Sequence, residues 1–156
     1  MNNIGFTKNL IKGKIAEIIF ERMLREAGVF TVIHFGYEYI LPELTRDKVI
    51  DKNSEAIDAI RTAPDFAVIN NDTKKVHLIE VKYLSTFSKS TVLRYAKKMS
   101  ASWNPSYIFL ATKGGFYFDE ISDVIKKKGD IGRLAHRNIS KELQDKYLGL
   151  LIEMEG

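Results

Sequence analysis

The sequence predicts an α/β fold in which a mixed central β-sheet is flanked by helices. Three observations lead to this prediction. The length of 156 residues suits one domain, 45% of the residues are apolar, and helical and strand patterns follow one another in the order αβββαβ. No internal repeat or linker divides the chain. We therefore expect one domain over residues 1–156, with its core at about 10–111 and a C-terminal hairpin and helices at 112–156.

The first predicted element is a helix over residues 11–27. Its apolar residues recur at helical spacing and form one broad face, and Gly28 follows as a stop. The residues of this face are Ala16, Ile19, Phe20, Met23, Leu24 and Ala27. Residues 30–40 are rich in β-branched and aromatic side chains, which predicts a strand, bent at Gly36.

A polar stretch over residues 41–63 follows and contains a weakly helical piece at 54–61. Two short strands are predicted next, at 66–69 and 76–83. The residues at 70–73 are Asn, Asn, Asp and Thr, all of which favour turns. The two strands are therefore expected to pair as a hairpin.

A helix is predicted over residues 88–100, and the short apolar run at 106–111 predicts a buried strand. The remaining elements expected are a turn at 114–115, a strand at 116–118 and helices at 121–128 and 140–154.

Composition restricts the chemistry. The chain has no cysteine, so disulfides and thiolate metal sites are excluded, and a metal would need carboxylate, imidazole or carbonyl ligands. The net charge of +4 is compatible with a polyanionic partner without requiring one. The N-terminal region has no long apolar run, from which we expect no signal peptide or membrane span and a cytoplasmic protein.

Charged residues end the apolar strand at 76–83. Side chains alternate between the faces of a strand, so Glu80 and Lys82 share one face with Val76 and Leu78. Burying a charge there is costly unless the charge is paired or bound. Asp65 opens the partner strand of the hairpin, which would place two carboxylates and one ammonium group in a single pocket.

Such a group of side chains is suited to a hard metal ion. Two adjacent carboxylates repel each other, and a divalent cation with oxygen ligands, Mg²⁺ or Mn²⁺, relieves the repulsion. A metal placed there can lower the pKa of a bound water and stabilise charge on a phosphate. The Lys82 ammonium could orient or help to deprotonate the attacking water.

The spacing of these residues resembles a known family. Pro64-Asp65, fourteen intervening residues and then Glu80-Val81-Lys82 is similar to the motif of PD-(D/E)xK nucleases, which hydrolyse phosphodiester bonds with metal ions on a restriction-endonuclease-like fold. The resemblance extends from the first helix to about residue 111. It is short, and the alternative is a surface aspartate at a turn and a same-face Glu–Lys pair on a half-exposed strand.

The resemblance implies a role for each residue. Asp65 and Glu80 would be metal ligands together with the main-chain carbonyl of Val81, Lys82 would be the catalytic lysine, and Glu17 on the first helix would hold the metal directly or through water. Glu17 has another interpretation, because a glutamate three residues after Lys14 is a common surface ion pair.

The resemblance also implies a substrate and an assembly. The compact arrangement looks most like archaeal Holliday-junction resolvases and related viral or mobile-element nucleases. We therefore expect a structure-specific DNA endonuclease, with a restriction-type or transposition nuclease as the alternative. A homodimer is expected, because duplex or branched DNA has two strands to cut; its candidate interfaces are residues 41–63 and the C-terminal helices.

Basic residues could contact DNA phosphates, which fix position without specifying sequence. The candidates are Lys89, Arg94, Lys97 and Lys98 on the helix at 88–100, and Lys14 on the first helix. The alternative is a solvated helix face. The three histidines His34, His77 and His136 are expected to be packing or surface residues rather than ligands.

Two rival functions stay open at this point. One is a non-catalytic nucleic-acid-binding module that kept the fold. The other is a small structural subunit whose basic face docks on an acidic partner protein. The sequence contains no arrangement that suggests a Ser-His-Asp triad and no phosphate-binding glycine loop.

Overall fold

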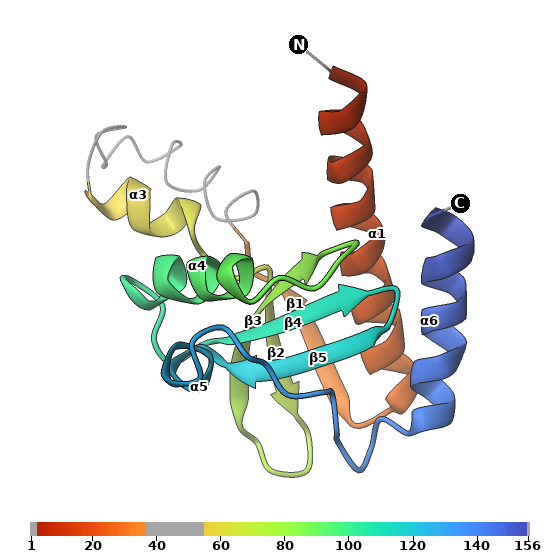
Figure 1. The fold of residues 1–156 in the computed structure, drawn as a ribbon. Coiled ribbons are helices and arrows are strands. Elements are labelled where there is room, and N and C mark those ends of the chain that lie inside the picture. The colour runs from red at the N-terminus through yellow and green to blue at the C-terminus, as the bar shows by residue number, and fades with distance from the viewer. Residues whose placement is uncertain (1–2, 37–54, 156) are drawn as a thin grey trace, which may run out of the picture.

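One five-stranded mixed sheet organises the molecule (Figure 1). The structure, a computed structural model, describes residues 3–36 and 55–155. The strands lie in the order β1-β2-β3-β4-β5 and are β1 (Phe30–His34), β2 (Phe66–Asn70), β3 (Val76–Tyr83), β4 (Tyr107–Thr112) and β5 (Gly115–Glu120). Neighbouring strands are antiparallel except β3 and β4, which are parallel. The predicted mixed sheet is therefore confirmed.

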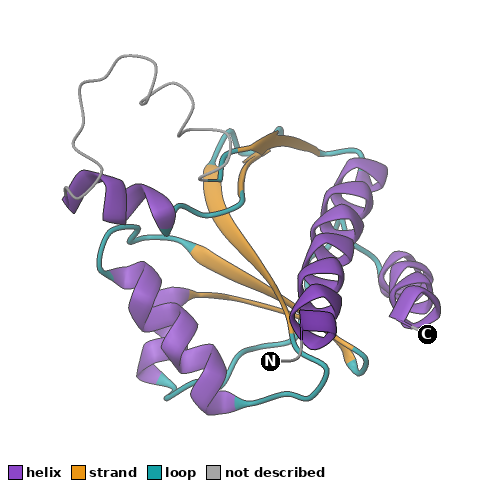
Figure 2. Ribbon diagram, turned by 90° about the horizontal axis from the view of Figure 1, so that it is seen from above, coloured by secondary structure: helices purple, strands orange, loops and turns teal. Residues whose placement is uncertain are grey.

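Helices cover both faces of this sheet, as Figure 2 shows from above. On one face lie α1 (Asn3–Ala27) and α6 (Lys141–Glu155), and on the other α4 (Lys89–Ser100) and α5 (Ile121–Lys126). The short helix α3 (Glu55–Arg61) lies beside the end of α4, where the Trp103 indole N–H donates to the Ala59 carbonyl at 2.8 Å. Two separate apolar cores result, one on each side of the sheet.

The predicted apolar face of α1 is buried against the sheet. Ala16, Ile19, Phe20, Met23 and Leu24 are all buried. The ring of Phe20 lies 5.1 Å from that of Phe66 and 4.8 Å from that of Phe109, so it links α1 to β2 and β4. The helix ends where expected, with Gly28 at a φ of +85°, a conformation that glycine adopts without strain.

The parallel pair places β4 in the interior. Ile108, Phe109, Leu110 and Ala111 are fully buried, which is why this strand has a continuous apolar run rather than an alternating one. The helix that connects β3 to β4 is α4, whose N-cap is Ser88; its hydroxyl accepts the Thr91 N–H.

Two predicted helix boundaries were wrong. The first helix begins at Asn3 rather than at residue 11. The prediction missed its first turns because their apolar side chains, such as Phe6 and Leu10, are exposed and form no buried stripe that would mark them as helical. The helix predicted at 121–128 ends at Lys126, since Lys128 and Gly129 have positive φ angles of 56° and 99°.

Apart from the strand predicted at 30–40, whose end was wrong, the other elements agree with prediction within two residues. The hairpin of β2 and β3 is confirmed, with Asn70 and Lys75 hydrogen-bonded across the turn. The weakly helical piece at 54–61 corresponds to α3, whereas residues 41–54 lie outside the described part of the chain. The strand predicted at 30–40 ends at His34; residues 37–40 lie outside the described part. Within residues 3–36 and 55–155, no helix combines the length and the apolar character that crossing a membrane requires.

Candidate active site

The two carboxylates of the predicted site meet where β2 begins. The antiparallel register pairs Phe66 with Ile79, so the preceding residue, Asp65, lies beside Glu80. The Asp65 Oδ2 accepts the main-chain N–H of Val81 at 2.8 Å. The Asp65 carboxylate thus takes the place of the main-chain carbonyl that a neighbouring strand would offer to the Val81 N–H.

Pro64 explains why the strand pairing stops here. Continuing the register by one more residue would place Pro64 opposite Val81. Proline has no N–H, so it cannot donate the main-chain hydrogen bond that an antiparallel partner would supply to the Val81 carbonyl. The Pro-Asp pair therefore ends the ladder and directs a carboxylate toward β3 at the same position.

The charges at this point are partly buried and incompletely paired. Glu80 has a side chain only 14% exposed; its Oε2 lies 3.5 Å from the Lys82 Nζ, and its Oε1 has no hydrogen-bond partner within residues 3–36 and 55–155. Burial raises the pKa of Asp65 to about 8, and both the charge of Glu80 and a hydrogen bond with that carboxyl act in the same direction. The Val81 N–H and Lys82 only partly oppose this rise. The pair is electrostatically strained and would gain from an added cation.

Lys82 is held between a carboxylate and an aromatic ring. Its ammonium lies 3.5 Å from Glu80 and 4.7 Å from the centre of the Tyr95 ring, which belongs to α4. Because Lys82 and Glu80 are on the α4 side of β3, the helix that follows the strand supplies the wall behind the lysine. Sequence reasoning did not identify Tyr95, since the contact depends on how α4 crosses the sheet.

An open polar cleft of about 440 Å³ contains these groups. Glu17 lies on its α1 side, where it pairs with Lys14 at 3.5 Å, so the alternative of a surface ion pair is confirmed and a role at a metal stays a prediction. The residues that line the cleft are Asn9, Lys12, Gly13, Glu17, Asp65, Glu80, Val81, Lys82, Tyr83, Leu84, Ser85 and Tyr95. The structure thus brings together Asp65, Glu80, Val81, Lys82 and Glu17, five residues that the sequence singled out.

These residues fit a hard divalent cation with few protein ligands. In the described ranges no three His, Asp or Glu side chains converge as a ready-made metal cage. Asp65 and Glu80 offer carboxylate oxygens, Val81 offers a carbonyl, and no described residue donates to the buried Glu80 Oε1. Mg²⁺ is commonly bound by one or two carboxylates and keeps several waters, so this donor set suits it.

The far wall of the cleft is fixed by the last turn of α6. Glu155 is only 5% exposed and receives the Tyr83 hydroxyl and the Lys12 ammonium, the latter at 3.3 Å. Burial alone would raise the pKa of Glu155, but hydrogen bonds from Tyr83 and Lys12, with Lys113 nearby, hold it below its usual value. No local sequence signal predicts this contact, which joins residues 72 or more positions apart.

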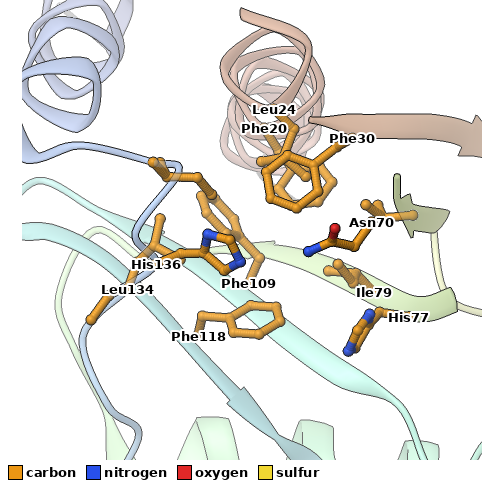
Figure 3. Close-up of a pocket in the computed structure, with 13 residues that line it drawn as sticks. Phe20, Leu24, Phe30, Asn70, His77, Ile79, Phe109, Phe118, Leu134 and His136 are labelled. Atoms are coloured by element: carbon orange, nitrogen blue, oxygen red, sulfur yellow. The ribbon is translucent and has the colours of Figure 1, made fainter. Parts of the chain in front are cut away.

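A second pocket lies between α1, the sheet and the segment before α6, and it is very different in character (Figure 3). It has a volume of about 200 Å³, and rings of Phe20, Phe30, Phe109 and Phe118 form much of its wall. His77 and His136 also line it, so both lie in a different pocket from the carboxylates. Burial lowers the pKa of His77, and the charges of Lys75 and His136 lower it further.

The predicted DNA-contacting residues separate into two groups. Arg94, Lys97 and Lys98 line a shallow groove along α4, together with Ser90 and Leu93. Lys89 is not among the residues of this groove, and Lys14 is engaged with Glu17. His34, the third histidine, lies on the surface and pairs with Glu21 at 3.0 Å.

No family model matches the chain, and neither a curated protein nor a solved structure matches it.

Proposed function

We propose that this protein is a Mg²⁺- or Mn²⁺-dependent DNA endonuclease with a restriction-endonuclease-like fold. One observation carries the proposal. In an open polar cleft, the Glu80 carboxylate has a buried oxygen that bonds to nothing in the described part of the chain, and it lies against Asp65, whose pKa is raised to about 8. Perturbed, incompletely satisfied charges in a cleft are typical of functional sites.

Asp65 and Glu80 would hold the metal ion, with the Val81 carbonyl as a further ligand. When bound, the ion lowers the pKa of a water molecule and withdraws charge from the phosphate. Asp65 keeps its orientation through the hydrogen bond from the Val81 N–H. Glu17, on the opposite side of the cleft, would contribute directly or through water.

Lys82 would act on the nucleophile and on the phosphate. Its ammonium is held in place by Glu80 and by the Tyr95 ring, so little conformational freedom is lost when substrate arrives. From this position it can orient the attacking water by hydrogen bonding and stabilise the negative charge that develops on the phosphate.

We further propose that the enzyme recognises the shape of branched DNA and acts as a homodimer. The described chain offers little protein that could enter a groove and read base edges, which favours contacts with the sugar-phosphate backbone. Exposed apolar side chains on the first half of α1 and on α6, among them Phe6, Ile11 and Ile152, are candidates for the dimer contact. Sedimentation at micromolar concentration should give a dimer; a monomer at all concentrations would contradict this part of the proposal.

The decisive experiment is a cleavage assay on labelled four-way junction, flap and linear duplex DNA with Mg²⁺, Mn²⁺ or EDTA. Wild-type protein is compared with Asp65→Ala and Lys82→Ala. The matched controls are Asp72→Ala and Lys75→Ala, which remove the same kinds of charge from the exposed turn between β2 and β3. We expect metal-dependent cutting that is lost in the first two variants and kept in the controls, with the junction preferred.

Each of the other outcomes would contradict part of the proposal or favour a different function. Equal cutting of all three substrates would remove the structure-specific part of the proposal. Salt-sensitive DNA binding without cutting in any metal would favour a non-catalytic binding module. Folded protein that neither binds nor cuts DNA at low salt would favour a structural subunit instead.

A further inference from the structure

Three surface depressions adjoin one another across the molecule, and together we call them the track. The cleft described above shares Glu80, Lys82 and Tyr95 with a smaller hollow of about 120 Å³ on the α3 and α4 side of β3. That hollow in turn shares Lys98 with the shallow groove along α4. The three depressions therefore follow one another from the cleft toward α4.

The part of the track beyond Glu80 carries mainly positive charge. Arg61 and Lys98 line the hollow, and Arg94 and Lys97 follow in the groove. Arg61 is 3.6 Å from Asp58, but both side chains are more than half exposed, so this pair is weak and easily exchanged. No carboxylate within the described residues pairs with Lys98, Arg94 or Lys97. Such cations are available for an anion.

The dimensions of the track favour one sugar-phosphate backbone. The hollow is large enough for a phosphate group and too small for a base pair. Side chains four residues apart on a helix, such as Arg94 and Lys98, are separated by roughly 5–6 Å at their Cβ atoms. This separation is similar to the spacing of successive phosphates along one strand, so consecutive cations can meet consecutive phosphates.

We propose that the hollow and the α4 groove bind the phosphates of the cut strand on one side of the scissile bond, with Lys98 at the junction of the two and Arg61 opposite it. This inference rests on the proposed nuclease function and adds to it the path of the strand. Because the contacts are to phosphates, the bases on that side are not read. The enzyme therefore needs several nucleotides on one side of the cut and accepts any sequence there.

The first test measures binding to labelled linear duplex and four-way junction DNA in EDTA, where the protein binds without cutting. Lys98→Ala is compared with Lys75→Ala, which removes a lysine from the exposed turn between β2 and β3, outside the track. Each lost phosphate contact makes the slope of log affinity against log salt concentration less steep by about 0.9 for duplex DNA. We expect this change, and several-fold weaker binding at low salt, for Lys98→Ala but not for Lys75→Ala. Equal slopes for the two variants would overturn the proposal.

The second test shortens the substrate from one end or from the other relative to the cleavage position. Removing the phosphates that follow the scissile bond on the α4 side should raise KM several-fold for wild-type protein. The same shortening should abolish the difference between wild type and Lys98→Ala, because the partner of Lys98 is then missing. An effect of Lys98→Ala that persists whichever end is shortened would contradict the track. Arg61→Ala should behave like Lys98→Ala.

These results separate the track from the nuclease proposal. Cutting by wild type with identical behaviour of Lys98→Ala and Lys75→Ala would leave the nuclease and remove the track. Binding that depends on Lys98, without cutting in any metal, would remove the nuclease and leave the track as a nucleic-acid contact. Absence of both binding and cutting would overturn both.

Discussion

The cleft and the apolar pocket are both built on β3, yet they differ in almost every physical respect. In the cleft, Glu80 has an oxygen with no hydrogen-bond partner among the described residues, and the pKa of the adjacent Asp65 is displaced far from its usual value. In the pocket of Figure 3, two polar side-chain atoms take part in local hydrogen bonds: the Asn70 Oδ1 accepts the N–H groups of Asp72 and Thr73, and the His136 Nδ1 accepts that of Asn138.

This contrast separates a cavity that packing explains from one that contains incompletely paired charges. The pocket is the more enclosed and apolar of the two, as a ligand site often is. Its walls are nonetheless explained by the packing of α1 against the sheet, and its polar groups by a turn and a loop. Of the two cavities, as far as the described residues show, the cleft is the one whose charged groups are left incompletely paired. Such strain is costly to the fold, which is why the proposed function is built on the cleft.

The largest expected effect comes from comparing one β3 residue in the cleft with one in the apolar pocket. Glu80→Gln keeps the size of the side chain and removes its charge, and we expect cleavage to fall at least about 10³-fold, roughly 4 kcal/mol of transition-state stabilisation. His77→Gln, three residues earlier on the same strand, should keep cleavage within about 2-fold of wild type, because residues remote from a site rarely affect it. Single-turnover cleavage rates compare the two. Similar losses of cleavage rate in both variants would show that the cleft and the pocket do not differ in their contribution to cleavage.

A change in the apolar pocket should instead affect stability. Leu24 is 4% exposed and lines this pocket, so Leu24→Ala should lower the free energy of unfolding by about 3 kcal/mol through lost burial and the enlarged cavity. Urea unfolding gives the value, and the cleavage rate measured well below the melting temperature should not change. The control is Ile18→Ala on the same helix, where the side chain is 60% exposed and a change within about 0.5 kcal/mol is expected.

In the cleft we expect the opposite effect: replacing Asp65 should raise the free energy of unfolding. A carboxyl whose pKa rises to about 8 on folding contributes stability that is complete below its unfolded pKa and is lost as the pH rises toward 8. Asp65→Asn abolishes this loss and should stabilise the metal-free protein at pH 8 by several kcal/mol.

The comparison is made by urea unfolding at pH 4 and pH 8 in EDTA, with Asp72→Asn as the control in the exposed turn. The gain of Asp65→Asn should nearly vanish at pH 4. Added Mg²⁺ should stabilise wild type and not the variant, since an ion that binds only the folded state raises its stability. A variant less stable than wild type at pH 8 would show that Asp65 is not strained.

The smallest effect concerns the polar group at the edge of the apolar pocket. Asn70→Ala loses the hydrogen bonds to the N–H groups of Asp72 and Thr73, at 2.9 and 3.2 Å, and should destabilise the hairpin by about 1 kcal/mol. Asn70→Asp keeps an acceptor at the same place and should recover most of this loss. If the two variants are equally unstable, the role of Asn70 lies in the pocket rather than in the turn.

The sequence by itself determined the order and type of the elements. Apolar periodicity located the buried face of α1 and the strands of the hairpin, and the continuous apolar run of β4 indicated a strand covered on both faces. It also singled out Asp65, Glu80 and Lys82, because charges at the end of an apolar strand are unusual. These signals are local, so they survive without knowledge of the fold.

The tertiary structure decided what lies around those residues. The ring of Tyr95 behind Lys82, the contact of Glu155 with Tyr83 and Lys12, and the shared position of Lys98 between hollow and groove all join elements far apart along the chain. The early start of α1 likewise has no sequence signal, because its first turns bury no apolar stripe. Periodicity reports which side of an element is buried, whereas the neighbours of a side chain depend on how helices cross the sheet, which no local pattern encodes.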